Sequence, residues 1–330
     1  MNPEITAMNP FNSLIRTELE HFENNLDVAL EADIELVDDI ARYMSRLKGK
    51  RLRPALALLS AKAVGLECRD DIIDAAVAVE MIHTATMVHD DVVDSATMRR
   101  GRESINEKWS GQVAVLMGDF LLAKALCMLV EIGNLQALAI VSKATQRLSV
   151  GEIFEIQIGE QHDVRESSYL CMVNDKTASL ISASVCLGPI FSKADQSVID
   201  SMKKYGELLG AAFQIADDIL DFTGDSATMG KPVGHDLREG KLTLPLIRAL
   251  QRAPMKVCER IKSLLSKPEK GEAEWQQIVT FVEEFSGVAA AEVTAREYSA
   301  QALKCLEILP ETPAREALEL AVELVVERKS

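Results

Sequence analysis

The sequence is short of positive charge. Its 330 residues include 36 Lys and Arg against 51 Asp and Glu, which gives a formal net charge of −15. A protein that binds nucleic acid generally needs a basic face to neutralise phosphates. The composition therefore disfavours a general nucleic-acid-binding role, and any lysine or arginine near a functional motif must act locally.

Cysteine pairs and targeting segments are also lacking. The six cysteines form no C-x-x-C pair and no short Cys/His cluster with metal-ligand spacing, so we expect reduced thiols. Residues 1–12 contain no basic segment that leads into an apolar run, and we identify no apolar run of about 18 residues that would span a bilayer. We expect a cytoplasmic protein and leave peripheral membrane contact open.

Proline is absent between Pro54 and Pro189, which allows long helices without kinks. Apolar residues recur at intervals of three and four through most of the chain, and strand-like alternation is scarce. We find no Gly/Ser/Pro linker and no internal repeat beyond an acidic motif. The sequence therefore predicts an all-α fold with one large helical domain over residues 1–330. The predicted helices are 11–30, 33–47, 53–65, 70–95, 104–108, 112–131, 134–160, 167–186, 195–222, 241–252, 255–266, 272–286, 288–308 and 313–328.

The pattern D-D-x-x-D occurs three times, beginning at Asp70, Asp90 and Asp217. The copy at Asp70 follows Gly65 and opens a predicted helix, where carboxylates complement the partial positive charge of the first turn. We interpret that copy as a helix cap. The other two copies come late in long apolar helices, so helix capping does not explain them.

Each of the later copies places two aspartates on one helix face. Asp90 and Asp94 are four residues apart, as are Asp217 and Asp221, so the carboxylates of each pair repel one another. A cation that takes oxygen ligands offsets this repulsion. Mg²⁺ suits a sparse carboxylate pair because it keeps waters and shares phosphate oxygens. The alternative is a solvated acidic patch, which two such copies together disfavour.

Basic residues accompany both of these copies. Arg99 and Arg100 follow the first, and guanidinium groups match phosphate oxygens bidentately. Lys231 and Lys241 each follow a glycine after the second copy, which is weak evidence alone. Upstream, the segment 49–54 reads GKRLRP at a predicted helix start, where a solvated basic turn is the alternative.

Five segments together resemble the trans-type polyprenyl diphosphate synthases in order and spacing, over roughly Lys48 to Arg248. They are GKRLRP, EMIHTATMVHDDVVDSATMRRGR, NDKTASL, FQIADDILDF and GKPVGHDLREGKLTLPLI. The resemblance implies a single all-α bundle of the isoprenoid synthase type around a deep central cavity, usually assembled as a homodimer.

The resemblance also implies roles for individual residues. Isopentenyl diphosphate would bind Lys50, Arg53, His83 and Arg100. The allylic diphosphate would meet Arg99, Lys176, Thr177, Gln214, Lys231 and Lys241. Mg²⁺ would bridge this diphosphate to Asp90, Asp94 and Asp217. The other three aspartates, Asp91, Asp218 and Asp221, would tune or complete the metal shell. The implied catalytic set is the six aspartates with Lys176 and Lys231.

The implied reaction breaks the C–O bond of the allylic diphosphate, which gives a carbocation and a highly charged leaving group. Metal ions and fixed Lys or Arg donors stabilise that leaving group. The alkene of isopentenyl diphosphate, held close and aligned, then attacks the cation, and proton loss restores a double bond. In the family the pyrophosphate is thought to accept this proton, so we expect no dedicated protein base. Phe213, Thr177 and Gln214 are expected to line the apolar cavity around the cation.

Product length depends on side chains in the turns before Asp90, along which the hydrocarbon extends. Short-chain members often carry an aromatic residue there, whereas this chain has Ala85 and Thr86. Phe154 and Met117 are deeper candidates for a floor, although plain core packing explains them too. The spacer in Asp90–Asp94 is also shorter than that of bacterial farnesyl synthases. We therefore expect a long product, about octaprenyl, grown from farnesyl diphosphate.

Three alternatives stay open at this point. A geranylgeranyl diphosphate synthase shares the catalytic motifs and differs in cavity depth. A terpene cyclase needs no isopentenyl site and commonly lacks the second acidic copy, so Lys50, Arg53 and His83 count against it. A regulatory subunit without catalysis predicts eroded aspartates, which are intact here. The sequence does not fix the product length, the allylic primer or the downstream pathway.

Overall fold

The computed structural model describes residues 13–46, 49–223, 234–267 and 270–326, and it confirms the all-α prediction. The chain divides into two compact units. The first unit comprises Met1–Thr145, Leu180–Lys203 and Leu306–Leu320, and the second comprises Gln146–Ser179, Lys204–Cys305 and Ala321–Ser330. The one-domain arrangement over residues 1–330 stays a prediction.

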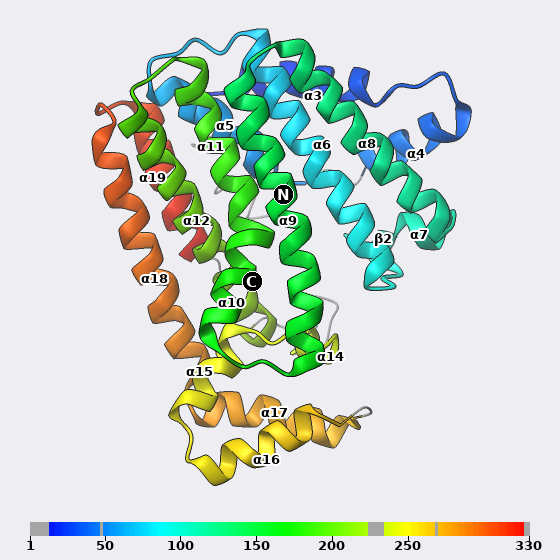
Figure 1. The fold of residues 1–330 in the computed structure, drawn as a ribbon, viewed down its shortest axis with the longest axis vertical. Coiled ribbons are helices and arrows are strands. Elements are labelled where there is room, and N and C mark those ends of the chain that lie inside the picture. Colours follow the sequence, from blue (N-terminus) through cyan, green and yellow to red (C-terminus); the bar gives the residue numbers. More distant parts are fainter. Residues whose placement is uncertain (1–12, 47–48, 224–233, 268–269, 327–330) are drawn as a thin grey trace. The chain divides into compact units, whose positions relative to one another are not determined.

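With the exception of α11, helices of the first unit follow the predicted ranges to within a few residues (Figure 1). They are α3 (Arg16–Leu30), α4 (Glu35–Ser45), α5 (Leu52–Ala63), α6 (Asp70–Val93), α7 (Ile105–Lys108), α8 (Gly111–Ile132) and α11 (Ser179–Phe191). The unit also holds the start of α9 (Leu135–Gln161), the start of α12 (Gln196–Thr223), the short 3₁₀ turn η2 (Leu306–Ile308) and the start of α19 (Pro313–Val326).

The second unit holds the remainder of α9, α12 and α19. Its further elements are α10 (Glu166–Val173), the π-helical turn η1 (Asn174–Ala178), α14 (His235–Arg238), α15 (Leu244–Arg252), α16 (Met255–Leu265), α17 (Glu272–Glu284) and α18 (Gly287–Cys305). Its core is an apolar cluster in which Ile215, Leu246 and Ile278 are fully buried. This core supports the second acidic motif, which lies near the end of α12.

Helix α6 forms the centre of the first unit. It packs along α8 (Figure 1), and alanines such as Ala75, Ala78 and Ala85 are completely buried. A helix that is apolar on every side is stable only when other elements surround it. Its first turn begins at Asp70, as the sequence predicted, although Arg69 is the N-cap residue and no side chain caps the helix.

The sequence was expected to contain no segment that could span a membrane. That expectation is wrong, because two helices are long and apolar enough to do so, judged by length and composition alone. One is α6, with a mean hydropathy of 1.2 and 67% of its most apolar 18-residue window buried. The other is α8, with a mean hydropathy of 2.1 and 33% of its window buried. Core helices also meet these criteria of length and hydropathy, and the burial of α6 is that of a core helix. All six cysteines lie in the described ranges, and none is in a disulfide, as expected.

Two local features differ from the sequence prediction. The connector after α6 contains a hairpin of β1 (Met98–Arg99) and β2 (Arg102–Glu103). Its two turn residues both have positive φ, 51° at Arg100 and 74° at Gly101, as in the tight turns that join twisted strands.

The predicted end of the helix at residue 186 is also wrong, because α11 continues through Pro189 to Phe191. Proline lacks the N–H that would bond to the carbonyl four residues earlier, and the burial of this helix outweighs that loss. Packing therefore decides the helix end. The same predicted helix also contains the π-helical turn, which its apolar pattern does not reveal.

Candidate active site

The first acidic motif ends α6 with three aspartates in three environments. Asp90 is half-buried, Asp91 is buried and Asp94 is exposed. Asp94 is the C-cap residue, and its backbone N–H donates to the carbonyl of Asp90 at 2.8 Å. The pairing of Asp90 and Asp94 on one helix face, expected from their spacing, therefore holds to the last turn.

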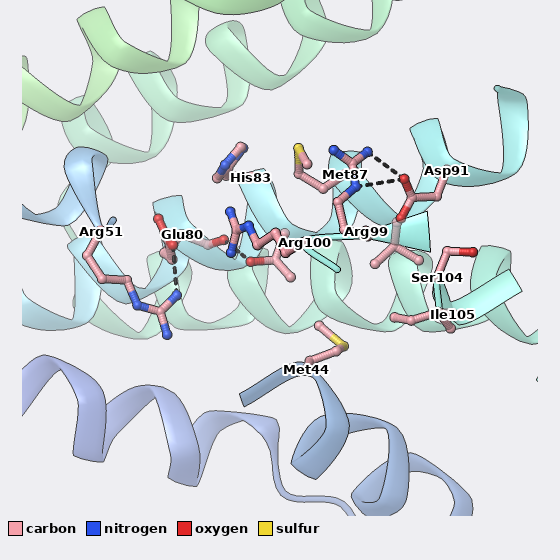
Figure 2. A pocket seen from close by; sticks show the side chains of 12 residues that line it. Met44, Arg51, Glu80, His83, Met87, Asp91, Arg99, Arg100, Ser104 and Ile105 are labelled. Carbon is pink, nitrogen blue, oxygen red and sulfur yellow. Dashed lines mark hydrogen bonds and ion pairs between the residues drawn. The ribbon is translucent and has the colours of Figure 1, made fainter. Parts of the chain in front are cut away.

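Asp91 is held by Arg99 from the hairpin. The Arg99 Nε donates to Asp91 Oδ1 at 2.8 Å, and a second guanidinium nitrogen contacts the same oxygen (Figure 2). A buried carboxylate needs such a partner, because desolvating an unpaired charge is costly. The buried carboxylate of Asp91 thus fixes Arg99, which was predicted to bind the allylic diphosphate, beside the motif.

A small cavity of about 80 Å³ lies beside this motif in the first unit. Three of its lining residues, Glu80, His83 and Met87, share a face of α6 with Asp91, and the hairpin adds Arg99 and Arg100 (Figure 2). Ser104 and Ile105 close one end. The cavity therefore joins His83 and Arg100, both predicted to bind isopentenyl diphosphate.

His83 is surrounded by cations. Burial lowers the pKa of its imidazole well below the usual value, and the charges of Arg53, Arg100, Arg99 and Arg51 lower that pKa further. The ring is therefore neutral at pH 7 and can donate one hydrogen bond without adding charge. The effect of Arg53 shows that the GKRLRP segment lies near His83 at the predicted site.

The GKRLRP segment also approaches the hairpin. A Cβ added at Gly49 would stand 2.9 Å from two guanidinium nitrogens of Arg100, so the end of the arginine side chain lies directly against this glycine. Lys50 is exposed and Arg53 is half-buried at the start of α5. The structure thus brings Arg53, His83 and Arg100 together in the first unit, with Lys50 on the same segment.

Arg51 is a residue of this region that sequence reasoning did not assign. It has φ 53° and ψ 36°, and it donates to Glu23 at 2.8 Å. It also donates to Glu80 at 2.8 Å (Figure 2). Glu80 is buried, so Arg51 compensates its charge and ties α3 to α6. Its position between Lys50 and Arg53 was the only sequence feature that pointed to a role for Arg51. The left-handed backbone conformation of an arginine cannot be read from a sequence.

The second acidic motif has a different internal arrangement. Asp217 is half-buried, whereas Asp218 is 2% exposed and accepts hydrogen bonds from Tyr169 Oη at 2.6 Å and Gln214 Nε2 at 2.9 Å. Burial raises the pKa of Asp218 to about 8, with smaller contributions in the same direction from Asp236 and Asp217. Tyr169 was missed by sequence reasoning, because a buried tyrosine is usually core.

Asp221 closes the second motif as a backbone acceptor. It is buried, and its two carboxylate oxygens accept from the N–H groups of His235 at 3.1 Å and Asp236 at 3.2 Å. These bonds satisfy the start of α14, whose first N–H groups have no partner inside the helix. The carboxylate of Asp221 therefore orders the segment that leads to Lys241.

The predicted diphosphate-binding residues of the second unit lie on several elements. Thr177 Oγ1 donates to Gln214 Oε1 at 2.8 Å, which links the π-helical turn to α12. Lys176 is in the same turn and contacts two glutamates of α9. Lys241 donates to Glu239 at 2.9 Å. Lys231 lies outside the described residues.

The predicted chain-length residues are placed as follows. Ala85 is fully buried in α6, and Thr86 is half-buried with its hydroxyl donating to the carbonyl of His83 at 2.8 Å. Met117 of α8 is also buried. Phe154 packs against the core of the second unit. Phe213 belongs to the same unit and is half-buried. Their roles in chain length stay predictions.

Whether these residues suit Mg²⁺ depends on the number of carboxylates at each motif. Within the described ranges, no three His, Cys, Asp or Glu side chains gather closely enough to hold a metal ion. Mg²⁺ needs fewer protein ligands than Ca²⁺, because it is usually held by one or two carboxylates together with substrate phosphates and water. The half-buried Asp90 and Asp217 and the exposed Asp94 fit that mode. Asp91, Asp218 and Asp221 bind the protein groups described above.

Comparisons with known proteins show the family to which the chain belongs. The family model for polyprenyl synthetase matches residues 34–282, so the chain belongs to the polyprenyl synthetase family. The chain is 34% identical to an octaprenyl diphosphate synthase of Escherichia coli, with 91% of this chain and 92% of the relative covered. It is 38% identical to a short chain isoprenyl diphosphate synthase of Methanothermobacter thermautotrophicus, with 85% and 87% covered.

A solved polyprenyl synthase from Caulobacter crescentus, complexed with calcium and isoprenyl diphosphate, has the same fold. It matches with a TM-score of 0.91 and 32% identity, and 98% of each chain is covered. The protein is therefore a prenyltransferase of the polyprenyl diphosphate synthase type, a family that acts on allylic diphosphates and isopentenyl diphosphate and generally uses a divalent metal.

Proposed function

We propose that this enzyme extends farnesyl diphosphate with several molecules of isopentenyl diphosphate to an all-trans product of about octaprenyl length. The observation that carries the long product is the pair of small side chains, Ala85 and Thr86, one turn before Asp90. An aromatic floor is absent at these two positions of the buried helix. The likeness to an octaprenyl diphosphate synthase supports the same proposal.

In this proposal Asp90, Asp94 and Asp217 would hold Mg²⁺, which would supply Lewis-acid stabilisation of a pyrophosphate leaving group. The chain's own cations do the rest of the binding. Lys176 and Arg99 contact the allylic diphosphate, and Arg53, Arg100 and the neutral His83 hold isopentenyl diphosphate. Fixed donors of this kind need little rearrangement as charge develops on the leaving group.

The alternative product is geranylgeranyl diphosphate, and the likeness to a short chain isoprenyl diphosphate synthase favours that alternative. The deciding experiment incubates the purified protein with farnesyl diphosphate, labelled isopentenyl diphosphate and Mg²⁺, and then sizes the products by chromatography. We expect products well beyond C20. Accumulation of C20 with nothing longer would contradict the long-chain proposal and leave the prenyltransferase activity intact.

A homodimer is also part of the proposal, and helix α8 supplies the surface for it. Val115, Leu116, Leu126 and Val130 are 40%, 60%, 44% and 63% exposed, and their spacing places them within one face of the helix. An exposed apolar face of this kind usually marks an interface. We expect Leu126→Glu with Val130→Glu to give a monomer in sedimentation analysis. An unchanged dimer, or a wild-type monomer that binds lipid vesicles, would contradict this interface.

A further inference from the structure

The π-helical turn Asn174–Ala178 interrupts two α-helices that are otherwise continuous in sequence. π-helical turns are rare and occur frequently at functional sites. This one carries Lys176 and Thr177, which the proposed function assigns to the allylic diphosphate. What holds the turn in place therefore determines where these two side chains stand.

Helix α9 holds the turn from one side through residues spaced by four, which share a helix face. Gly151 lies so close that an added Cβ would be 2.4 Å from the backbone nitrogen of Lys176. Glu155 and the neighbouring Glu152 accept hydrogen bonds from Lys176 Nζ at 2.6 and 2.7 Å. These two ion pairs raise the pKa of Lys176 despite its burial and keep the ammonium charged.

Helix α12 holds the turn from another side with the same spacing. An added Cβ at Gly210 would be 2.5 Å from the Cα of Ala178, so the two backbones are in direct contact. One turn further along α12, Gln214 accepts from Thr177 and donates to Asp218. The turn is thus linked by hydrogen bonds to the second acidic motif.

Arg147 holds the first two residues of the turn. Its Nε donates to Asp175 Oδ1 at 2.6 Å, and a terminal nitrogen donates to the carbonyl of Asn174 at 3.2 Å. The other terminal nitrogen is 3.4 Å from Glu207 of α12. The guanidinium is 23% exposed. Arg147 belongs to neither of the acidic motifs and is not among the predicted diphosphate-binding residues. It nevertheless contacts both α12 and the turn that carries Lys176.

We propose that Arg147 is a positioning residue for the allylic diphosphate. By fixing Asn174 and Asp175 it sets the register of the π-helical turn, and so holds Lys176 and Thr177 side by side between α9 and α12. This inference rests on the proposed function, because the substrate assigned to Lys176 comes from there. The isopentenyl site, which lies in the first unit, should be insensitive to Arg147.

The test is Arg147→Gln, which keeps the length and polarity of the side chain and removes the charge and the fork. We expect kcat/KM for the allylic diphosphate to fall about tenfold, because charge-assisted hydrogen bonds are lost. The KM for isopentenyl diphosphate should change less than about twofold, since uniform structural damage would alter both substrates. Arg147→Lys should recover part of the loss, because lysine restores the charge without the planar fork.

The matched control is Lys143→Gln, which removes one positive charge from an exposed site one turn earlier on α9. It should behave as wild type for both substrates. Asp175→Asn is a second variant, because asparagine keeps an acceptor oxygen and the side-chain shape. It should shift the allylic kcat/KM in the same direction by a smaller factor, even if Arg147→Gln does not fold.

Amide hydrogen exchange gives a readout that does not depend on turnover. Exchange at residues 174–180 should be faster in Arg147→Gln than in wild type, with exchange in α15 to α17 unchanged. Equal effects on both substrates, or wild-type values for the allylic substrate and for exchange, would overturn the inference. A wild-type protein that consumes no allylic diphosphate would instead defeat the proposed function, and the exchange measurement would still test the role of Arg147.

Discussion

The two acidic motifs share a five-residue pattern and a place at the end of a long helix, but their middle and last aspartates are used differently. In the first motif Asp91 is paired with a charged arginine, and Asp94 is exposed. In the second motif Asp218 is held by a tyrosine and a glutamine, and Asp221 binds backbone N–H groups. The pattern therefore specifies where carboxylates stand, whereas their neighbours decide what each one does.

This difference separates the predicted metal ligands from the aspartates that support them. Asp91, Asp218 and Asp221 are held by the protein partners described above, whereas Asp90, Asp94 and Asp217 are the ligands that the family resemblance implies. The assignment of two ligands to one motif and one ligand to the other stays a prediction. The comparison can be tested at three levels.

The largest effect is expected from removing a metal ligand of either motif. Asp90→Ala and Asp217→Ala should each lower Mg²⁺-dependent turnover by roughly a hundredfold or more while leaving the protein folded, because neither removes core volume. Asp70→Ala is the matched control from the third copy of the pattern and should keep near-normal turnover. Near-normal activity in either of the first two variants would falsify the metal-site assignment.

A smaller effect should distinguish the two middle aspartates. Arg99→Met leaves the buried carboxylate of Asp91 without its cation and should lower the free energy of unfolding by about 2 kcal/mol, since Arg99 is partly solvent-exposed. Tyr169→Phe removes one neutral donor from Asp218, which keeps Gln214, and should cost about 1 kcal/mol. Urea unfolding measures both. Equal losses would mean that the two aspartates are held in the same way.

The double variant Arg99→Met with Asp91→Asn sharpens this measurement. Removing both charges should recover part of the stability lost in Arg99→Met, because the cost comes mainly from the unpaired carboxylate. Strictly additive losses would show that Arg99 stabilises the hairpin by packing and not through Asp91.

The smallest effect concerns pH and the first site only. Burial and the charges of Arg51, Arg53, Arg99 and Arg100 lower the pKa of His83 in the folded protein below its ordinary value of 6.5. Below that value the unfolded chain binds a proton at this histidine that the folded protein does not, so the contribution of His83 to stability falls as the pH drops from 6.5. At about pH 5.5 the loss should be about 1 kcal/mol.

His83→Gln removes this contribution, so on going from about pH 6.5 to 5.5 the variant should gain about 1 kcal/mol of stability relative to the wild type. His162→Gln, at an exposed position, is the control and should follow the wild-type curve. Parallel curves for wild type and His83→Gln in unfolding experiments would show that His83 does not carry the pH dependence.

The sequence predicted much of the fold because helix formation here follows local rules. The spacing of apolar residues located most helices, and the run without proline indicated their length. The role of Asp70 as a helix start was also readable, because it depends on a neighbouring glycine and the apolar pattern that follows. The helix end predicted at residue 186 was wrong, because the helix continues through Pro189 to Phe191. Tertiary packing decides that end, and local sequence rules do not describe it.

The acidic motifs, their basic neighbours and membership of a prenyltransferase family were determined by the sequence alone, because they depend on residue type and spacing. Only the tertiary structure decided that Arg51 compensates the buried Glu80, that Tyr169 holds Asp218, and that Arg147 holds a π-helical turn. These pairs join residues 29, 49 and 28 positions apart. Burial makes such partners necessary, and burial exists only once the chain has folded.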